Sequence, residues 1–246
     1  MNITINGKTC ACEKGEFLLE VARRNDILIP TLCHHPALAG QGCCRVCLAE
    51  VDEGRGPKIV VSCVYPIQRE CLVETESERV RKERGMVLAL LRKRAPDSQR
   101  IAALCQLYQA PELPRLQAAD SGKCILCGLC VRACGELSVG AISTVNRGVG
   151  KEIATPYHEE SAVCVGCGSC ASVCPTEAIP LTQTEDTRTI WGKTFQLVRC
   201  RRCGAVLGTR EELELAARRS GQEPETLCER CRKAGIAQVL AAVYGE

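Results

Sequence analysis

Aromatic side chains are scarce in this sequence, whose 246 residues include 2 Phe, 4 Tyr and 1 Trp. A core built mainly on large rings is therefore excluded, and so is a row of aromatic platforms for stacking single-stranded bases. Long apolar runs are also missing, because the longest extends only from Met86 to Leu91, far short of a membrane span. The first residues lack the basic and apolar regions of a signal peptide. We therefore expect a cytoplasmic protein with no membrane span.

Cysteine is the residue that the chain has in excess, with 21 copies. At this density cysteines form either the disulfide scaffold of a short secreted chain or metal sites. This chain is neither short nor visibly secreted, so the thiols are expected to stay reduced unless a metal binds them. The arrangement of the cysteines then decides which metal chemistry the chain carries.

Residues 1–76 are predicted to form a small β-rich domain. The patterns of apolar and turn residues predict strands over 2–5, 9–13, 48–51 and 59–62, with a helix over 16–24. This order fits a β-grasp arrangement. The overall fold class is predicted to be α+β.

Residues 77–115 are predicted to form a helical linker. Ser77 can cap a helix that runs to about Arg94, where Ala95-Pro96 stops it, and a second helix starts at Asp97 or Ser98. The basic residues between Arg79 and Arg94 are interpreted as the solvated face of the first helix.

The most specific pattern is a repeated cysteine motif in a domain expected over 116–185. Two runs with the spacing C-x2-C-x2-C-x3-C match at every cysteine. In two-cluster ferredoxins the fourth cysteine of each run ligates the other run's [4Fe-4S] cluster. The predicted ligand sets are Cys124, Cys127, Cys130 and Cys174 for one cluster, and Cys134, Cys164, Cys167 and Cys170 for the other. Zinc is the alternative, but one zinc ion needs four ligands and has no use for a triple-cysteine run.

A different cysteine set lies in the N-terminal domain. Cys33, Cys44, Cys47 and Cys63 have the spacing C-x10-C-x2-C-x15-C, which differs from the plant-type spacing but keeps a loop cysteine, a close pair and a distant fourth. We predict a [2Fe-2S] cluster here. Cys43 could compete with Cys44, but only Cys44 keeps the two-residue gap to Cys47.

Several cysteines and histidines are interpreted as non-ligands. Small, partly buried side chains account for Cys10, Cys12, Cys71 and Cys105. The two histidines directly after Cys33 could donate hydrogen bonds near the cluster, but we expect them to lie on the loop surface. Ligation by three clusters changes the charge, because each brings about −2, so the formal +3 of the apo chain becomes about −3. The basic balance is thus no argument for a nucleic-acid partner.

Beyond Thr182 a polar linker is expected to lead to a four-cysteine module over 190–246. Cys200, Cys203, Cys228 and Cys231 form two C-x2-C pairs, which favours one structural zinc in a zinc-ribbon-like module, although a single iron or a further [4Fe-4S] cluster uses the same ligands. A capping box at residues 209–212 predicts a helix that ends at Gly221. A later helix carries an apolar stripe from Ile236 to Val243, which could dock on a partner or on the module's own core.

These motifs carry a resemblance to a known family. The residues concerned are 29–33 (IPTLC), 44–47 (CRVC) and 123–134 (KCILCGLCVRAC). Residues 1 to about 185 resemble the ferredoxin-like N-terminal part shared by the large iron-sulfur subunit of complex I, the diaphorase subunit of NAD-linked hydrogenases and the iron-only hydrogenase large subunit. The family's additional His- and Cys-ligated [4Fe-4S] cluster is expected to be absent, because residues 84–123 contain Cys105 alone and no His.

The resemblance implies an electron-transfer subunit without substrate chemistry of its own. Its implied partners are a flavin- and NAD(P)-binding subunit and a hydrogenase or formate dehydrogenase catalytic subunit, in a hetero-oligomer that could bifurcate electrons; a complex I-like enzyme is an alternative. The sequence itself has no G-x-G-x-x-G dinucleotide motif after a predicted strand. A zinc-rich interaction protein is the alternative from another class, and the triple-cysteine runs argue against it.

Overall fold

The computed structural model describes residues 1–137 and 139–244, so the last two residues of the predicted C-terminal module lie outside the described residues. The fold is α+β. Contacts divide the chain into two compact units. One contains Met1–Arg132 and Val173–Ala178, and the other contains Ala133–Ser172 and Ile179–Glu246.

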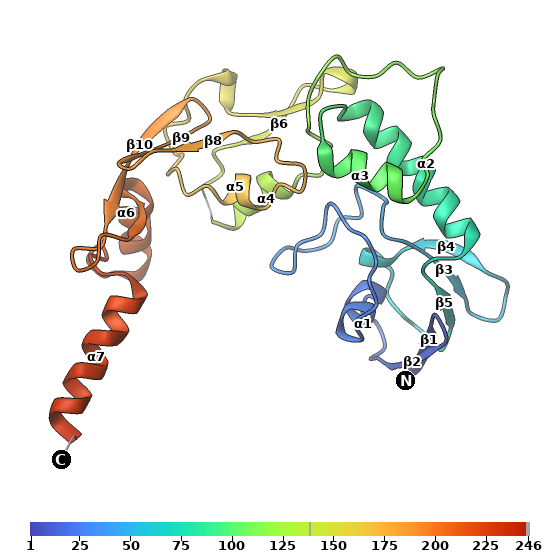
Figure 1. Ribbon diagram of the computed structural model, residues 1–246, viewed down its shortest axis with the longest axis horizontal. Coiled ribbons are helices and arrows are strands. Elements are labelled where there is room, and N and C mark those ends of the chain that lie inside the picture. The colour runs from blue at the N-terminus through green and yellow to red at the C-terminus, as the bar shows by residue number, and fades with distance from the viewer. Residues whose placement is uncertain (138, 245–246) are drawn as a thin grey trace. The chain divides into compact units, whose positions relative to one another are not determined.

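The first unit is built on a five-stranded sheet (Figure 1). Its strands are β1 (Asn2–Ile5), β2 (Lys8–Ala11), β3 (Leu48–Asp52), β4 (Lys58–Val61) and β5 (Leu72–Glu74). The order is β2-β1-β5-β3-β4, with β1 and β5 parallel and the other pairs antiparallel. The helix α1 (Leu18–Arg24) completes the core of this sheet, and the 3-10 turn η1 (Ser62–Val64) follows β4.

The core of this sheet follows the alternation seen in the sequence. Ile3 and Ile5 face inward on β1, and Val51 and Val73 do so on β3 and β5. Cys10, Cys12 and Cys71 are buried in the same core, where burial raises the pKa of Cys71 to about 11. Their interpretation as small core side chains is confirmed.

Two helices follow the sheet as predicted. Ser77 caps α2 (Glu78–Arg94) by accepting a hydrogen bond from Val80 N, and Ser98 caps α3 (Gln99–Leu107) by accepting one from Ile101 N. Cys105 lies partly buried on α3 and donates to Leu88 O at 3.5 Å. The basic residues of α2 were predicted to form a solvated face. For Arg84 this prediction is wrong, because its side chain is completely buried.

The second unit contains most of the remaining elements. The helix α4 (Leu129–Glu136) runs across the division between the units. In the two-stranded sheet of β6 (Ser143–Val145) and β7 (Glu152–Ala154), the 3-10 turn η2 (Gly148–Gly150) lies between the strands, and a second 3-10 turn, η3 (Pro156–His158), follows β7. The short helix α5 (Ser169–Ser172) follows the second cysteine run.

A four-stranded antiparallel sheet in the order β11-β10-β9-β8 follows in this unit. Its strands are β8 (Leu181–Gln183), β9 (Thr187–Ile190), β10 (Lys193–Arg199) and β11 (Val206–Thr209). The polar residues after Thr182, predicted as a linker, therefore form β8 and β9. Threonines at alternate positions explain the error, because they give these strands a polar composition although β9 is partly buried.

The predicted capping box begins α6 (Arg210–Ser220), and Gly221 ends it with a φ of 67°. In Figure 1 the last helix, α7 (Glu229–Tyr244), projects away from the sheet and α6 of its own unit. Its stripe is exposed, between 51% at Leu240 and 66% at Val243. Of the two alternatives, docking on a partner or on the module's own core, the second does not occur among the described residues. None of the described helices is both long enough and apolar enough to cross a membrane.

Candidate metal centres

The N-terminal cysteine set is buried beneath a loop of the first unit. Cys33 and Cys44 lie on the segment between α1 and β3, Cys47 directly precedes β3, and Cys63 lies in η1. The backbone N–H of Cys44 donates to Cys33 Sγ at 3.4 Å. Hydrogen bonds from the thiols of Cys44 and Cys63 hold the pKa of Cys33 well below its usual value. These hydrogen bonds place the sulfur of Cys33 beside those of Cys44 and Cys63.

The neighbouring Cys43 differs from these four cysteines in its exposure and hydrogen bonding. It is exposed, and its thiol donates to Gln41 Oε1 at 3.4 Å. Burial raises its pKa, as does the charge of Cys33. A buried Cys44 beside an exposed Cys43 favours the choice that the two-residue gap to Cys47 predicted.

The two histidines after Cys33 do not both lie on the surface. The side chain of His34 is only 7% exposed, with Nε2 3.0 Å from Glu20 Oε1 and Nδ1 2.9 Å from Arg23 Nη1. The prediction of a surface histidine is therefore wrong for His34, which holds the cluster loop against α1. Burial is the main cause of its lowered pKa.

Two glycines of the same loop were missed in the sequence. A Cβ at Gly40 would lie 2.8 Å from Cys63 O, and Gly42 has a φ of 62° with Val64 Cγ2 3.0 Å from its would-be Cβ. Side chains at these positions would push the loop away from Cys63. The Gly-Gln-Gly triplet ahead of the close cysteine pair was the available signal.

Arg132 connects the first run to this loop. Its Nη2 donates to Cys33 O at 3.2 Å, and Nη1 donates to Ala39 O. Arg132 was also missed, because only the folded first unit brings residues 99 positions apart together. The guanidinium connects the loop that contains Cys33 and Ala39 to α4 within this unit.

The first unit gathers the first predicted [4Fe-4S] ligand set, because Cys174 belongs to its Val173–Ala178 segment. Backbone N–H groups donate to two of the sulfurs, from Leu126 to Cys124 at 3.4 Å and from Ala178 to Cys174 at 3.2 Å. Burial is the main cause that raises the pKa of Cys127 to about 11 and that of Cys130 to about 12, and the charges of Cys124 and Cys174 contribute to both shifts. Cys174 therefore lies beside the first run.

The second unit gathers the other set in the same way, with Cys134 beside the second run. Burial is the main cause that raises the pKa of Cys164 and that of Cys170, the latter to about 11, and the charge of Cys134 contributes to both shifts. Ala141 N donates to Cys134 Sγ at 3.2 Å, and Trp191 Nε1 donates to Cys170 Sγ at 3.4 Å. A cavity lined by these cysteines, Cys167 and apolar side chains lies among them.

The two runs repeat in backbone conformation as well as in sequence. Leu126 and Gly166 occupy equivalent positions with φ of 54° and 66°, and Gly128 and Gly168 do so with φ of 72° and 77°. Left-handed residues at both positions curl each loop so that its backbone N–H groups turn inward. Inward N–H groups suit a cofactor that carries negative charge.

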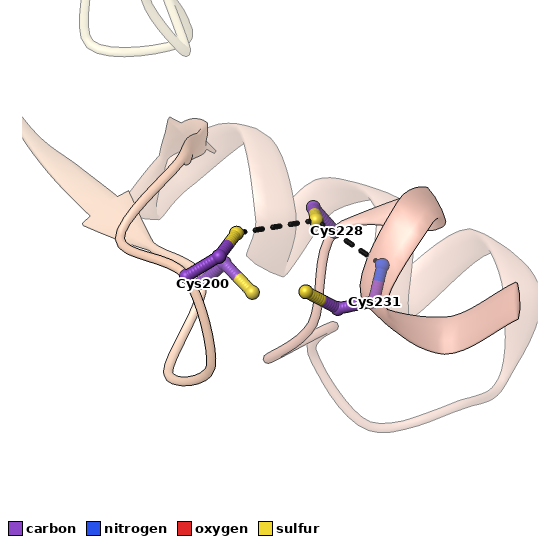
Figure 2. Close-up of side chains that lie close together, drawn as sticks. Cys200, Cys228 and Cys231 are labelled. Atoms are coloured by element: carbon purple, nitrogen blue, oxygen red, sulfur yellow. Dashed lines mark hydrogen bonds between the residues drawn. The ribbon is translucent and has the colours of Figure 1, made fainter. Parts of the chain in front are cut away.

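The four C-terminal cysteines form a compact site in the second unit. Figure 2 shows the side chains of Cys200, Cys228 and Cys231 turned toward one another, and with Cys203 all four sulfurs lie within 4.8 Å of one another. Cys203 Sγ is 3.6 Å from Cys228 Sγ. Hydrogen bonds from backbone N–H groups, led by that of Cys228, lower the pKa of Cys200 to about 6. A thiol that ionises this readily is ready to bind a cation.

The chain matches two domain families. A 2Fe-2S iron-sulfur cluster binding domain matches residues 1–78, and a 4Fe-4S dicluster domain matches residues 123–178. The N-terminal match covers all four predicted strands, the helix and all four N-terminal cysteines, and the second match covers both cysteine runs.

Among curated proteins, the chain is similar to the NADP-reducing hydrogenase subunit HndD of Solidesulfovibrio fructosivorans, with 32% identity over 73% of this chain and 36% of the relative. It is 27% identical to the mitochondrial NADH-ubiquinone oxidoreductase 78 kDa subunit of Candida albicans, over 73% of this chain and 28% of the relative. It is 30% identical to the NADPH-Fe(3+) oxidoreductase subunit alpha of Geobacter sulfurreducens, over 72% of this chain and 23% of the relative. The chain thus spans about a third or less of the length of these relatives.

A solved structure of an NAD+-reducing [NiFe]-hydrogenase in its H2-reduced state has a similar fold. The TM-score is 0.60 at 24% sequence identity, over 72% of this chain and 85% of that chain. This likeness concerns the fold alone.

Proposed function

We propose that this chain, which resembles the iron-sulfur subunits of NAD(P)-linked hydrogenases and complex I, is an electron-transfer subunit of a multi-subunit oxidoreductase. It relays electrons between a flavin- and NAD(P)-binding subunit and the catalytic subunit of a hydrogenase. The observation that carries the proposal is the order of a [2Fe-2S] domain and a dicluster domain in one chain. A formate dehydrogenase or complex I-like enzyme is the second candidate, because a putative formate dehydrogenase of Staphylococcus haemolyticus is among the relatives.

The proposed clusters are one [2Fe-2S] and two [4Fe-4S]. Their ligands are Cys33, Cys44, Cys47 and Cys63, then Cys124, Cys127, Cys130 and Cys174, then Cys134, Cys164, Cys167 and Cys170. Two features support these sets: each set lies within a single compact unit, and backbone N–H groups donate to a sulfur in each. When bound, the clusters accept and release single electrons. The protein supplies thiolates, N–H donors and a shell that excludes water.

The C-terminal cysteines are proposed to hold one structural zinc in a zinc-ribbon-like module. Four sulfurs placed tetrahedrally at about 2.3 Å from one zinc lie about 3.8 Å apart. The 3.6 Å between Cys203 and Cys228, and the 4.8 Å limit for all four, match one ion better than a larger four-iron cluster. The remaining division into a β-grasp domain over 1–76, a linker over 77–115, a dicluster domain over 116–185 and this module is proposed with it.

A reconstitution experiment tests the electron-transfer role. The purified chain with its clusters should be reduced by NADH or NADPH only when a flavoprotein subunit from the same host is added, and a cytoplasmic preparation should yield the two together. Reduction by the nucleotide without any flavoprotein, or hydrogen uptake by the chain alone, contradicts the proposal. A dithionite-reduced sample serves as the control for intact clusters.

A further inference from the structure

The residues after the second cysteine run form a hairpin over the cavity of that run. The strands β9 and β10 are joined by Trp191 and Gly192, and Ile190 pairs with Lys193 across the turn. Ile190 and Trp191 line the same cavity as the cysteines of the second set. This hairpin lies beyond the matched dicluster domain, which ends at residue 178. Its contact with the second run is therefore a feature of this chain's C-terminal part.

The indole of Trp191 reaches one of the proposed ligands. Its Nε1 donates to Cys170 Sγ at 3.4 Å. A donor that stabilises the thiolate also stabilises negative charge on a cluster that this thiolate holds.

The turn itself is an unusual place for a tryptophan. Trp191 has a φ of 53° and Gly192 a φ of 78°. In a two-residue hairpin loop with two positive φ values the first position favours Asn, Asp or Gly, because they tolerate the left-handed region. A bulky aromatic residue there is strained, and such strain concentrates at functional sites. The turn alone thus gives no reason for an indole at residue 191.

Two cations flank the same turn and hold the second run. Arg188 Nη1 donates to Gly166 O at 2.9 Å and to Cys167 O at 3.2 Å, and its side chain is 14% exposed. Lys193 Nζ donates to Cys164 O at 3.2 Å and to Ser161 O at 3.4 Å. Both positive charges therefore lie beside the loop that would surround the second cluster.

We infer that the β9–β10 hairpin sets the reduction potential of the second [4Fe-4S] cluster, with Trp191 as the positioning residue that donates to its Cys170 ligand. Reduction adds one electron to the cluster and makes or breaks no bond, so the reduced cluster is the more negative form. The indole N–H and the charges of Arg188 and Lys193 stabilise that form and raise the potential. The inference rests on the proposed cluster at Cys134, Cys164, Cys167 and Cys170.

The test is a redox titration of the full-length chain followed by electron paramagnetic resonance. Iron analysis first establishes that each variant keeps both [4Fe-4S] clusters. Trp191→Phe removes the N–H and keeps a ring, so it should lower the midpoint potential of one [4Fe-4S] signal and leave the other unchanged. Thr194→Val, an exposed substitution on the same hairpin, should shift neither signal.

A second variant covers the case in which Trp191→Phe loses the cluster. Lys193→Met removes one positive charge and should lower the potential of the same signal, whatever the fate of the tryptophan variant. Unchanged or raised potentials in the variants that retain the cluster overturn the inference without touching the proposed function. A wild-type chain with no second [4Fe-4S] signal instead overturns the proposed ligand set.

Discussion

Arg84 is the largest completely buried side chain among the described residues, and it stabilises the segment around Cys47. Its guanidinium donates to Val46 O at 3.0 Å, to Leu48 O at 2.8 Å and to Thr75 O at 2.9 Å. It also lies 4.7 Å from the centre of the Tyr108 ring and pairs with Glu76 at 2.6 Å. A residue on a helix thereby fixes the backbone on both sides of a proposed cluster ligand.

Arg84→Ala should lower the free energy of unfolding by about 3 to 5 kcal/mol, because three buried carbonyl groups lose their donors. Arg81→Ala is the matched control on the same helix. Arg81 also pairs with Glu76, but its side chain is 42% exposed. Its replacement should therefore lower the free energy of unfolding by only about 1 kcal/mol. Chemical denaturation of the anaerobic proteins measures both, and equal losses would contradict the role given to Arg84.

The adjacent cysteines 43 and 44 allow a ligand test at the same scale. Cys44→Ser should abolish the [2Fe-2S] signal or shift it strongly, because the buried thiol is a proposed ligand. Cys43→Ser should leave it unchanged, because that thiol is exposed. Visible circular dichroism of the oxidised proteins distinguishes the two. Loss of the signal in the Cys43 variant alone would show that Cys43, and not Cys44, is the ligand.

At the scale of elements, the two cysteine loops have similar backbone conformations but different packing neighbours. The first loop has Leu126 at a φ of 54°, so a positive φ does not by itself require glycine at the equivalent Gly166. A Cβ at Gly166 would lie 2.6 Å from the Phe195 ring on β10. The packing of β10 against the second loop therefore explains the glycine.

Gly166→Ala should consequently reduce the occupancy of the second [4Fe-4S] cluster, because the loop or the Phe195 ring must move. In Gly128→Ala of the first loop, the new Cβ would meet only Gln41 Oε1, at 3.6 Å, so only the backbone strain of about 1 kcal/mol is added. Iron content per chain measures the difference. If Gly128→Ala loses as much iron as Gly166→Ala, the packing explanation is wrong.

Local sequence signals predicted some of the elements and residues but not others. Capping residues and apolar periodicity predicted α2, α3 and α6 because these signals are local, and the cysteine spacing grouped the thiols of each loop. Arg84, Arg132 and Trp191 could not be found in the same way, because their partners lie far along the chain or on another element. The strands β8 and β9 were missed because exposed threonines resemble a polar linker.

For the whole molecule, the central claim is that three iron-sulfur clusters and one zinc occupy sixteen of the cysteines. Analysis of iron, zinc and acid-labile sulfide in the anaerobically purified full-length chain tests it most directly. The proposed ligand sets predict about 10 iron, about 10 sulfide and about one zinc per chain. Zinc in place of iron, without sulfide, would contradict the electron-transfer account, and about 14 iron without zinc would contradict the zinc site.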